Sequence, residues 1–100
     1  MAFDLIEKVF AQTGVSEQIV VASRTCSSVT FQAKRGNSNA CQIAPETFVT
    51  GKGYELVKPT ADEKLPEKEF TSPGREGINL STWYGMGTAG EGINIIIEEF

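Results

Sequence analysis

Residues 78–100 read INLSTWYGMGTAGEGINIIIEEF, and this stretch decides the fold class of the chain. Isoleucine and aromatic residues suit the pleated, half-buried surface of a β-sheet. The glycines between the two apolar runs permit the positive φ angles that tight connections need. The last run must pair with a neighbouring strand, because an unpaired strand leaves an edge that invites aggregation. We therefore expect an all-β domain whose final strand is held within a sheet.

The composition agrees with one small globular domain over residues 1–100. Hydrophobic residues make up 40% of the chain and charged residues 22%, which is ordinary for a soluble domain. The ten glycines exceed the usual ~7%. Most of them lie between β-like runs, so they favour many turns over long helices.

The charge pattern argues against a nucleic-acid or membrane partner. The net charge is −4, and Lys34-Arg35 is the one adjacent pair among nine dispersed basic residues. Nucleic-acid interfaces need a clustered basic surface, and anionic lipid surfaces attract the same kind of cluster. No apolar run approaches the ~20 residues of a membrane span. The first residues lack the basic and apolar regions of a signal peptide, so we expect synthesis in a cytoplasm.

The N-terminal segment has the apolar spacing of a helix. Phe3, Ile6 and Phe10 recur at helical intervals. Asp4 three residues before Glu7 resembles a capping box, and Gly14 offers a stop. We predict a short helix over residues 5–12 within an N-terminal helix or arm (residues 1–14); a strand is the alternative.

From residue 15 onward the pattern predicts a β-sandwich (residues 15–100). Val29, Phe31 and Ala33 alternate with polar residues, the turn-forming residues 34–39 follow, and a return strand over 40–43 completes a predicted hairpin across 28–44. Further runs are expected at 19–22, 47–49, 54–58, 70–72, 78–84 and 92–98, with an exposed charged loop at 59–69. Short runs at this spacing predict a small antiparallel β-sandwich or jelly roll.

The glycine-rich connection matches a phosphate-binding motif in letters only. Residues 85–90 (GMGTAG) fit G-x-G-x-x-G, but a dinucleotide site needs a helix here and an acidic residue about 20 positions later. The remaining residues are β-like. We therefore expect a turn between strands, with structural glycines at Gly85, Gly87, Gly90 and Gly92.

No residue pattern points to catalysis, a metal or a cofactor. The chain has no histidine, the commonest general base and metal ligand. We expect Cys26 and Cys41 to be buried, reduced thiols, although adjacent strands could bring them together as a bridge. Glu98 and Glu99 are expected to keep an edge strand soluble. The sequence thus predicts a protein that is not an enzyme.

Aromatic and apolar side chains are the candidate contact sites. Trp83 and its neighbour Tyr84 point to opposite faces of a strand. We favour core packing for Trp83, which leaves Tyr84 to face solvent or a partner. Phe3, Ile6 and Phe10 either cap the sandwich or form an arm that docks on a neighbour. The candidate partner contacts are therefore Phe3, Ile6, Phe10 and Tyr84.

Several short signatures resemble those of small bacteriophage virion structural proteins. In that family a strand of the "VTIQA" kind leads to a Gly/Asn turn, and an "NLSxxY" strand passes through "GTAGDxV" to an "NVIYE"-like strand. The matching segments here are residues 29–33 (VTFQA), 36–38 (GNS), 79–84 (NLSTWY), 87–92 (GTAGEG) and 93–95 (INI). The likeness covers roughly residues 26–98, and this chain has Glu91 where the pattern often has Asp.

The resemblance implies a β-sandwich or jelly-roll subunit of a phage particle, made in the host cytoplasm. It carries over structural residues alone, Asn79 and Ser81 in the strand and Gly87, Ala89 and Gly90 in the turn. We expect a capsid decoration (cement) protein that binds the major capsid protein as a homo-oligomer, with a trimer favoured. The alternative is a ligand- or carbohydrate-binding module of a phage head or tail, which predicts an exposed aromatic platform at Trp83 or Tyr84.

Overall fold

The first half of the chain pairs with its second half in reverse order, like one long hairpin. The computed structural model describes residues 3–20, 24–45, 53–60 and 63–100. The nested antiparallel pairs are β1 (Phe3–Val9) with β10 (Gly92–Glu98), β2 (Glu17–Gln18) with β9 (Tyr84–Met86), β3 (Thr25–Cys26) with β8 (Ile78–Asn79), β4 (Ser28–Ala33) with β7 (Glu67–Thr71), and β5 (Cys41–Ala44) with β6 (Tyr54–Leu56).

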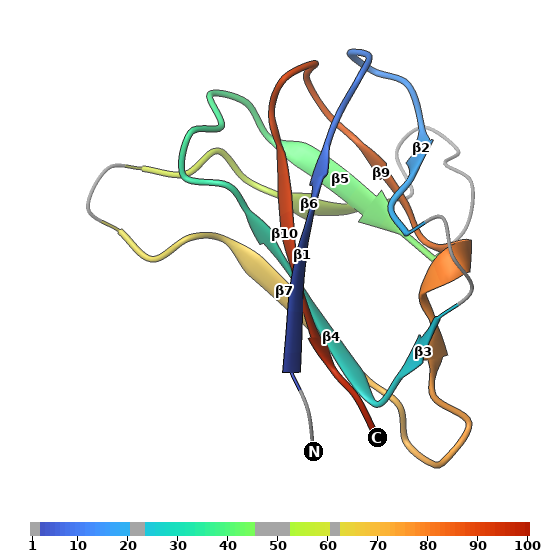
Figure 1. Cartoon of the computed structure of the whole chain (residues 1–100). Helices are drawn as coiled ribbons and strands as arrows, with labels where there is room; N and C mark the ends of the chain where they lie inside the picture. Colours follow the sequence, from blue (N-terminus) through green and yellow to red (C-terminus); the bar gives the residue numbers. More distant parts are fainter. Residues whose placement is uncertain (1–2, 21–23, 46–52, 61–62) are drawn as a thin grey trace.

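Two further pairings roll this hairpin into a sandwich. β10 also pairs with β4, and β5 also pairs with β9. The result is one sheet with the order β1-β10-β4-β7 and a second with the order β2-β9-β5-β6, with β3 and β8 as a small extra ribbon (Figure 1). A long hairpin rolled into two four-stranded sheets is a jelly roll. The predicted all-β antiparallel fold is therefore confirmed.

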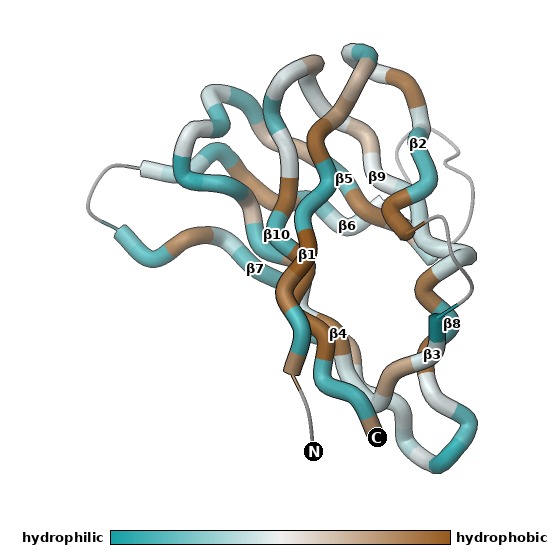
Figure 2. Tube along the Cα trace, in the orientation of Figure 1, coloured by the Kyte–Doolittle hydropathy of each residue, from teal (hydrophilic) through white to brown (hydrophobic). Residues whose placement is uncertain are grey.

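The core lies between the two sheets and is dominated by alternate residues of β4 and β10. Ile93, Ile95 and Ile97 are fully buried, as are Val29 and Phe31 of the neighbouring strand. Figure 2 shows brown, apolar residues along the neighbouring strands β1, β10 and β4. Each fully buried side chain of this size stabilises the fold by roughly 1.5–3 kcal/mol relative to an exposed one. The central position of β10 explains why the isoleucine-rich run was the strongest signal in the sequence.

The predicted helix over residues 5–12 is wrong, because this segment forms strand β1. Its residues alternate between exposed and half-buried, which is the period of a strand. The ladder from Phe3 opposite Glu98 to Val9 opposite Gly92 satisfies the backbone, whereas so short a helix is marginal in water. The strand alternative is the observed one.

The predicted hairpin across residues 28–44 is also wrong. β4 and β5 belong to different sheets, and the connection between them crosses from one layer to the other. Asn37 fastens this connection to the start of β10: its Nδ2 donates to Gly92 O (2.8 Å), and its Oδ1 accepts from Gly92 N (3.0 Å). Residues 34–39 do reverse the chain, as their composition predicts, but they form an arch that connects β4 in one sheet to β5 in the other.

Other boundaries shift by a few residues. The charged loop predicted at 59–69 ends earlier, because Glu67 already begins β7. The run at 54–58 forms β6 over Tyr54–Leu56, while the run predicted at 47–49 lies outside the described residues. In the described part of the chain the one helical element is the three-residue 3₁₀ turn η1 (Leu80–Thr82). No described helix has the length and apolar character needed to span a bilayer.

The prediction that Glu98 and Glu99 protect an edge strand is wrong. β10 lies between β1 and β4, so Glu98 is part of an interior strand. Its carboxylate accepts a hydrogen bond from Ser28 Oγ (3.3 Å) on the neighbouring strand, and Glu99 pairs with Arg24. The edge strands of this sheet are β1 and β7, and β1 is the one that carries exposed large apolar residues.

Candidate functional site

The outer face of the first sheet carries a strip of exposed apolar side chains. Phe3 is 69% exposed, Leu5 66% and Val9 48%, and all three lie on one face of β1. Ile96 of β10 lies directly opposite Leu5 and extends the patch across the sheet. We call Phe3, Leu5, Val9 and Ile96 the β1 strip. Exposed apolar residues that cluster in this way mark contact surfaces more often than scattered ones do.

The same residues of β1 leave their backbone groups free. Phe10 N donates to Glu91 O and Gly90 N donates to Phe10 O, so Phe10 directs both backbone groups toward β10. Successive residues of a strand alternate in this respect. The odd-numbered residues 3–9 therefore direct their N–H and C=O groups away from β10, and no other described strand pairs with that side. β1 offers an open edge beside an apolar face.

Acidic side chains flank the strip. Glu7, Glu67, Glu69 and Glu98 lie on the same outer face, because their register places them opposite outward residues of β10 and β4. Lys34 forms an ion pair with Glu7, and Lys64 lies 3.7 Å from Glu67. A partner for this face needs apolar atoms for the strip and basic groups for its surroundings.

The inner face of β1 is closed by charged groups that hold the strand on the sandwich. Lys8 Nζ lies 3.0 Å from Glu17 Oε1, and Arg24 bridges Asp4 (2.8 Å) and Glu99 (2.6 Å). Glu17 also accepts hydrogen bonds from the backbone of Ala11 and Gln12. Burial acts to raise the pKa of Glu17, but these hydrogen bonds outweigh it and the pKa is lowered. The strand is therefore anchored from within, and its outer edge stays open.

Only one of the four predicted partner contacts is prominent on this surface. Phe3 lies at the end of the strip. Ile6 is half-buried on the inner face of β1, where it packs against the core. Phe10 is 1% exposed, so the docking-arm alternative is wrong for it. Tyr84 is half-buried on β9, opposite Gln18 of β2 and Ala44 of β5.

Sequence reasoning missed Leu5, Val9 and Ile96 as members of the exposed β1 strip. Phe3, Leu5 and Val9 share a period of two, which is a strand signal. Phe3, Ile6 and Phe10 fit a helical period equally well, and that reading placed Leu5 and Val9 off the contact face. Ile96 was hidden in a continuous run of isoleucines, in which periodicity cannot separate the two faces.

The four structural glycines are explained by close packing and by one turn. Cβ atoms on Gly85 and Gly87 would lie 2.9 Å and 2.7 Å from the ring of Phe10, so these residues make room for that side chain. Gly90 has φ +85°, as the predicted turn requires. Gly92 lies in β10 itself, where a Cβ would meet Lys8 O at 2.1 Å. The phosphate-binding geometry is not built, because strand β10 follows this connection.

Glu91 has a clear structural role. Its carboxylate accepts hydrogen bonds from the backbone N–H groups of Ser38 (2.9 Å) and Asn39 (3.2 Å). The side chain thereby joins the glycine-rich connection to the arch between β4 and β5.

Both cysteines are buried free thiols, as predicted. Burial raises the pKa of Cys26, and it raises that of Cys41 to about 11, helped by the nearby carboxylates of Glu91 and Glu55. A thiol that resists ionisation is a poor nucleophile. Within the described residues no group of three His, Cys, Asp or Glu side chains could hold a metal ion.

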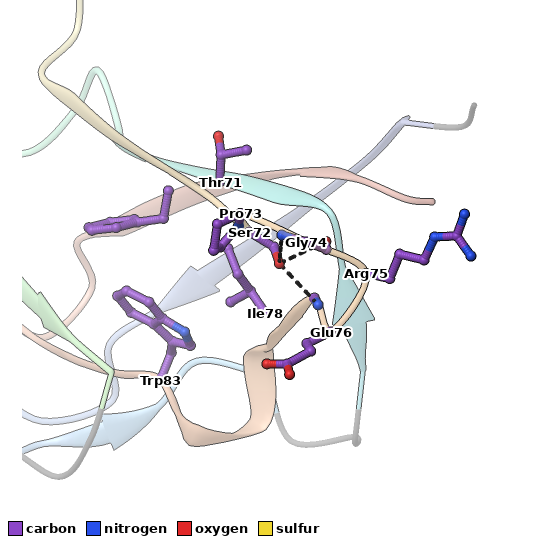
Figure 3. A pocket seen from close by; sticks show the side chains of 10 residues that line it. Thr71, Ser72, Pro73, Gly74, Arg75, Glu76, Ile78 and Trp83 are labelled. Carbon is purple, nitrogen blue, oxygen red and sulfur yellow. Dashed lines mark hydrogen bonds between the residues drawn. The ribbon is translucent and has the colours of Figure 1, made fainter.

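Trp83 is a core residue, as favoured from the sequence. It is 5% exposed, and its ring centroid lies 4.9 Å from that of Phe31 and 4.8 Å from that of Phe70. An exposed aromatic platform is therefore absent at Trp83. Its indole instead lines the wall of a pocket at the end of β7 (Figure 3).

Comparison with known proteins returned no match: no family model fits the chain, and neither the curated proteins nor the solved structures contain a significant relative.

Proposed function

We propose that this protein is a non-enzymatic structural component of a bacteriophage particle, which docks on the capsid through the β1 strip and the open edge of β1. The carrying observation is that exposed apolar side chains and free backbone groups belong to the same residues of β1. A partner can cover the side chains and extend the sheet at once, the mode known as β-strand addition. The virion assignment itself rests on the sequence resemblance.

The jelly-roll architecture is compatible with this role, because viral capsid domains use it repeatedly. Many unrelated functions share this fold, so it supports the proposal only by analogy. The surface is more specific. An edge strand with exposed apolar residues is a liability that proteins usually protect. Covering it with a shell protein removes the liability and supplies adhesion.

The chemistry of the face favours a different protein over a second copy as the occupant. Two β1 edges paired with each other would satisfy their backbones but leave both strips uncovered. Two outer faces stacked on each other would bring glutamates against glutamates. The proposed occupant is therefore an extended segment of the major capsid protein, with apolar residues for the strip and basic residues for its acidic border. Repeated copies on one shell would multiply the strength of a modest contact.

The test is co-sedimentation of purified protein with phage heads that lack it, followed by heating of the heads. We expect saturable binding and a higher rupture temperature. Leu5→Lys should weaken binding at least tenfold, since it places a charge in the contact. Val57→Lys is the matched control, because Val57 is 54% exposed and lies outside the strip. Failure to bind, or equal binding by the Leu5 variant, would refute the proposal. Copy number per shell and light scattering of the free protein test the predicted trimer.

A further inference from the structure

The two edges of the first sheet, β1 and β7, carry different side chains at equivalent backbone positions. On β1 the free N–H and C=O groups belong to residues 3, 5, 7 and 9, whose side chains point to the outer face. Three of these residues, Phe3, Leu5 and Val9, are exposed and apolar, and the fourth is Glu7. A strand added here would set its own outward side chains beside them, because directly paired residues lie on one face of a sheet.

The β7 edge presents carboxylates at the corresponding positions. Pro66 O accepts from Ala33 N (2.9 Å), so the even-numbered residues of β7 direct their backbone groups toward β4. The free groups therefore belong to Glu67, Glu69 and Thr71, which are all exposed. Pairing this edge with β1 of another copy would bury carboxylates against the apolar β1 strip, at a cost in desolvation.

Lys68 protects the β7 edge further. It lies opposite the fully buried Phe31, so its side chain points to the inner side of the sheet, and yet the residue is exposed. An inward-pointing charge on an edge strand is one way in which β-proteins prevent edge-to-edge pairing. Asp4 and Lys8 also point inward on β1, but each is neutralised by an ion pair within the chain. Of the two edges, β1 is therefore the one that can accept another strand.

A second copy of the chain does not supply the complement of Glu7. When two β1 strands pair edge to edge, the outward residues of one meet the outward residues of the other, which are Phe3, Leu5, Glu7 and Val9. Every register within residues 3–9 therefore sets Glu7 opposite an apolar side chain or opposite the other Glu7. Like charges directly opposite each other destabilise a strand pair, whereas opposite charges stabilise it. The complementary strand has a basic residue at this position and apolar residues at the other three.

Glu7 can accept a basic partner although Lys34 already contacts it. Lys34 Nζ pairs with one carboxylate oxygen, Oε2, and the Glu7 side chain is 61% exposed. A carboxylate offers about four lone-pair sites, so a second cation can bind. Glu98, opposite Phe3 on β10, adds negative charge to the same face.

We propose that the free edge of β1 recognises a seven-residue extended segment of its partner, as long as β1 itself, with the pattern apolar-x-basic-x-apolar-x-apolar. The segment runs antiparallel to β1, as every described strand pair does, and its basic residue lies opposite Glu7. The x residues are polar and face the side of Asp4 and Lys8. This inference rests on the docking surface proposed above and adds the sequence pattern that the surface selects.

The test uses the purified protein and capped synthetic peptides with the core VTKTVTV. Three companion peptides are VTETVTV, with glutamate in place of lysine, VTVTKTV, which has the pattern of a parallel strand, and VVTTTKV, which has the same composition without the alternation. We expect saturable binding of VTKTVTV with a dissociation constant of roughly 1 mM, the weak end of the affinity scale. It should bind about threefold more tightly than VTETVTV, and the other two peptides should bind more weakly.

Hydrogen exchange followed by NMR shows whether the peptide adds as a strand. Binding should slow the exchange of the amides of Leu5, Glu7 and Val9, which point away from β10 in the free protein. The amides of Ile6 and Lys8 are already directed to β10, so their exchange should change less.

Substitutions of Glu7 test the charge match. Glu7→Lys should reverse the preference, so that VTETVTV binds about threefold more tightly than VTKTVTV, and Glu7→Gln should remove the preference. Glu69→Lys is the matched control, because Glu69 lies on the same outer face at the β7 edge. That variant should keep the wild-type preference.

Three results would overturn the inference: equal binding of the lysine and glutamate peptides to the wild type, tighter binding of VTVTKTV, or unchanged exchange at Leu5, Glu7 and Val9 in the presence of saturating peptide. The inference and the capsid role can fail separately. Heads that bind the protein through Leu5 while the peptides do not bind would refute the sequence pattern alone. Peptide binding without attachment to heads would refute the capsid role alone.

Discussion

At the scale of one residue, Gly92 is a strand position that has no room for a side chain. It lies in β10 opposite Val9, and a Cβ would approach Lys8 O to 2.1 Å. No rotamer change can relieve a clash between Cβ and backbone. Asn37 also binds both backbone groups of Gly92, so the strand cannot move away freely.

We predict that Gly92→Ala lowers the free energy of unfolding by about 2–3 kcal/mol, the usual cost of overpacking a tight site. Urea denaturation followed by Trp83 fluorescence measures it. Gly36→Ala is the matched control, because a Cβ there meets nothing within 4 Å and its φ is ordinary. That variant should change stability by no more than about 0.5 kcal/mol. Equal effects of the two substitutions would contradict the packing argument.

Cys41 gives the fold a pH dependence in the alkaline range. Burial raises its pKa to about 11 from the ordinary 9.0, so the folded state favours the neutral thiol. The resulting stabilisation is complete below about pH 9 and is lost as the pH rises toward 11. We predict that wild type loses about 2 kcal/mol more stability than Cys41→Ala between pH 8 and pH 10.5. Denaturation of both proteins at the two pH values checks this. Lysine and tyrosine titrations cancel in the comparison, and parallel curves would refute the assignment.

At the scale of elements, the arch over residues 34–39 is fastened to β10 by one amide side chain. Asn37 is buried, and its two hydrogen bonds to Gly92 replace the ladder bonds that a hairpin would have made. Removing this side chain leaves the N–H of Gly92 without its acceptor, while the Gly92 C=O keeps the bond from Lys34 N (3.2 Å). A buried donor left unpaired in this way is costly.

We predict that Asn37→Ala lowers the free energy of unfolding by about 2–3 kcal/mol. Hydrogen exchange should show the Gly92 amide losing protection more than the amides of Ile95 and Ile97 in the same strand. Asn39→Ala is the control, since Asn39 is exposed and its side-chain contact to Glu91 is long, at 3.4 Å. Unchanged protection of Gly92 would show that other contacts hold the arch.

The elements were predictable from the sequence where the pattern had one interpretation. Strict alternation in residues 29–33 and the isoleucine-rich end of the chain gave β4 and β10, and with them most of the core. Residues 3–10 fit both a strand and a helix, so only the partner strand β10 decides between them. Because the helix was chosen, Leu5 and Val9 were not predicted to belong to an exposed surface. Phe3 was predicted correctly, because it is exposed under either interpretation.

At the scale of the whole molecule, the nested pairing could not be deduced from local patterns. Turn residues at 34–39 predict a change of direction but say nothing about whether the next strand stays in the sheet. In this chain β4 pairs with β7 and β10, and β5 pairs with β6 and β9. Likewise, the pocket combines residues 70–78, from β7, the following turn and β8, with Trp83, and no sequence motif predicts it.

The same topology predicts slow folding. β1 pairs with β10 across nearly the whole chain, so the outer pairs form only after most of the chain is ordered. Long loops must close before these contacts contribute, and all-β domains of this kind fold in milliseconds to seconds. Stopped-flow dilution from urea, followed by Trp83 emission, should give a dominant folding phase in that range.

Leu5→Lys should leave the rate unchanged, because an exposed side chain adds little to the folded ladder. Ile95→Val, in the central strand, should lower stability by about 1 kcal/mol and change the folding or unfolding rate accordingly. A dominant microsecond phase would mean that local contacts, and not the closure of the rolled hairpin, set the barrier.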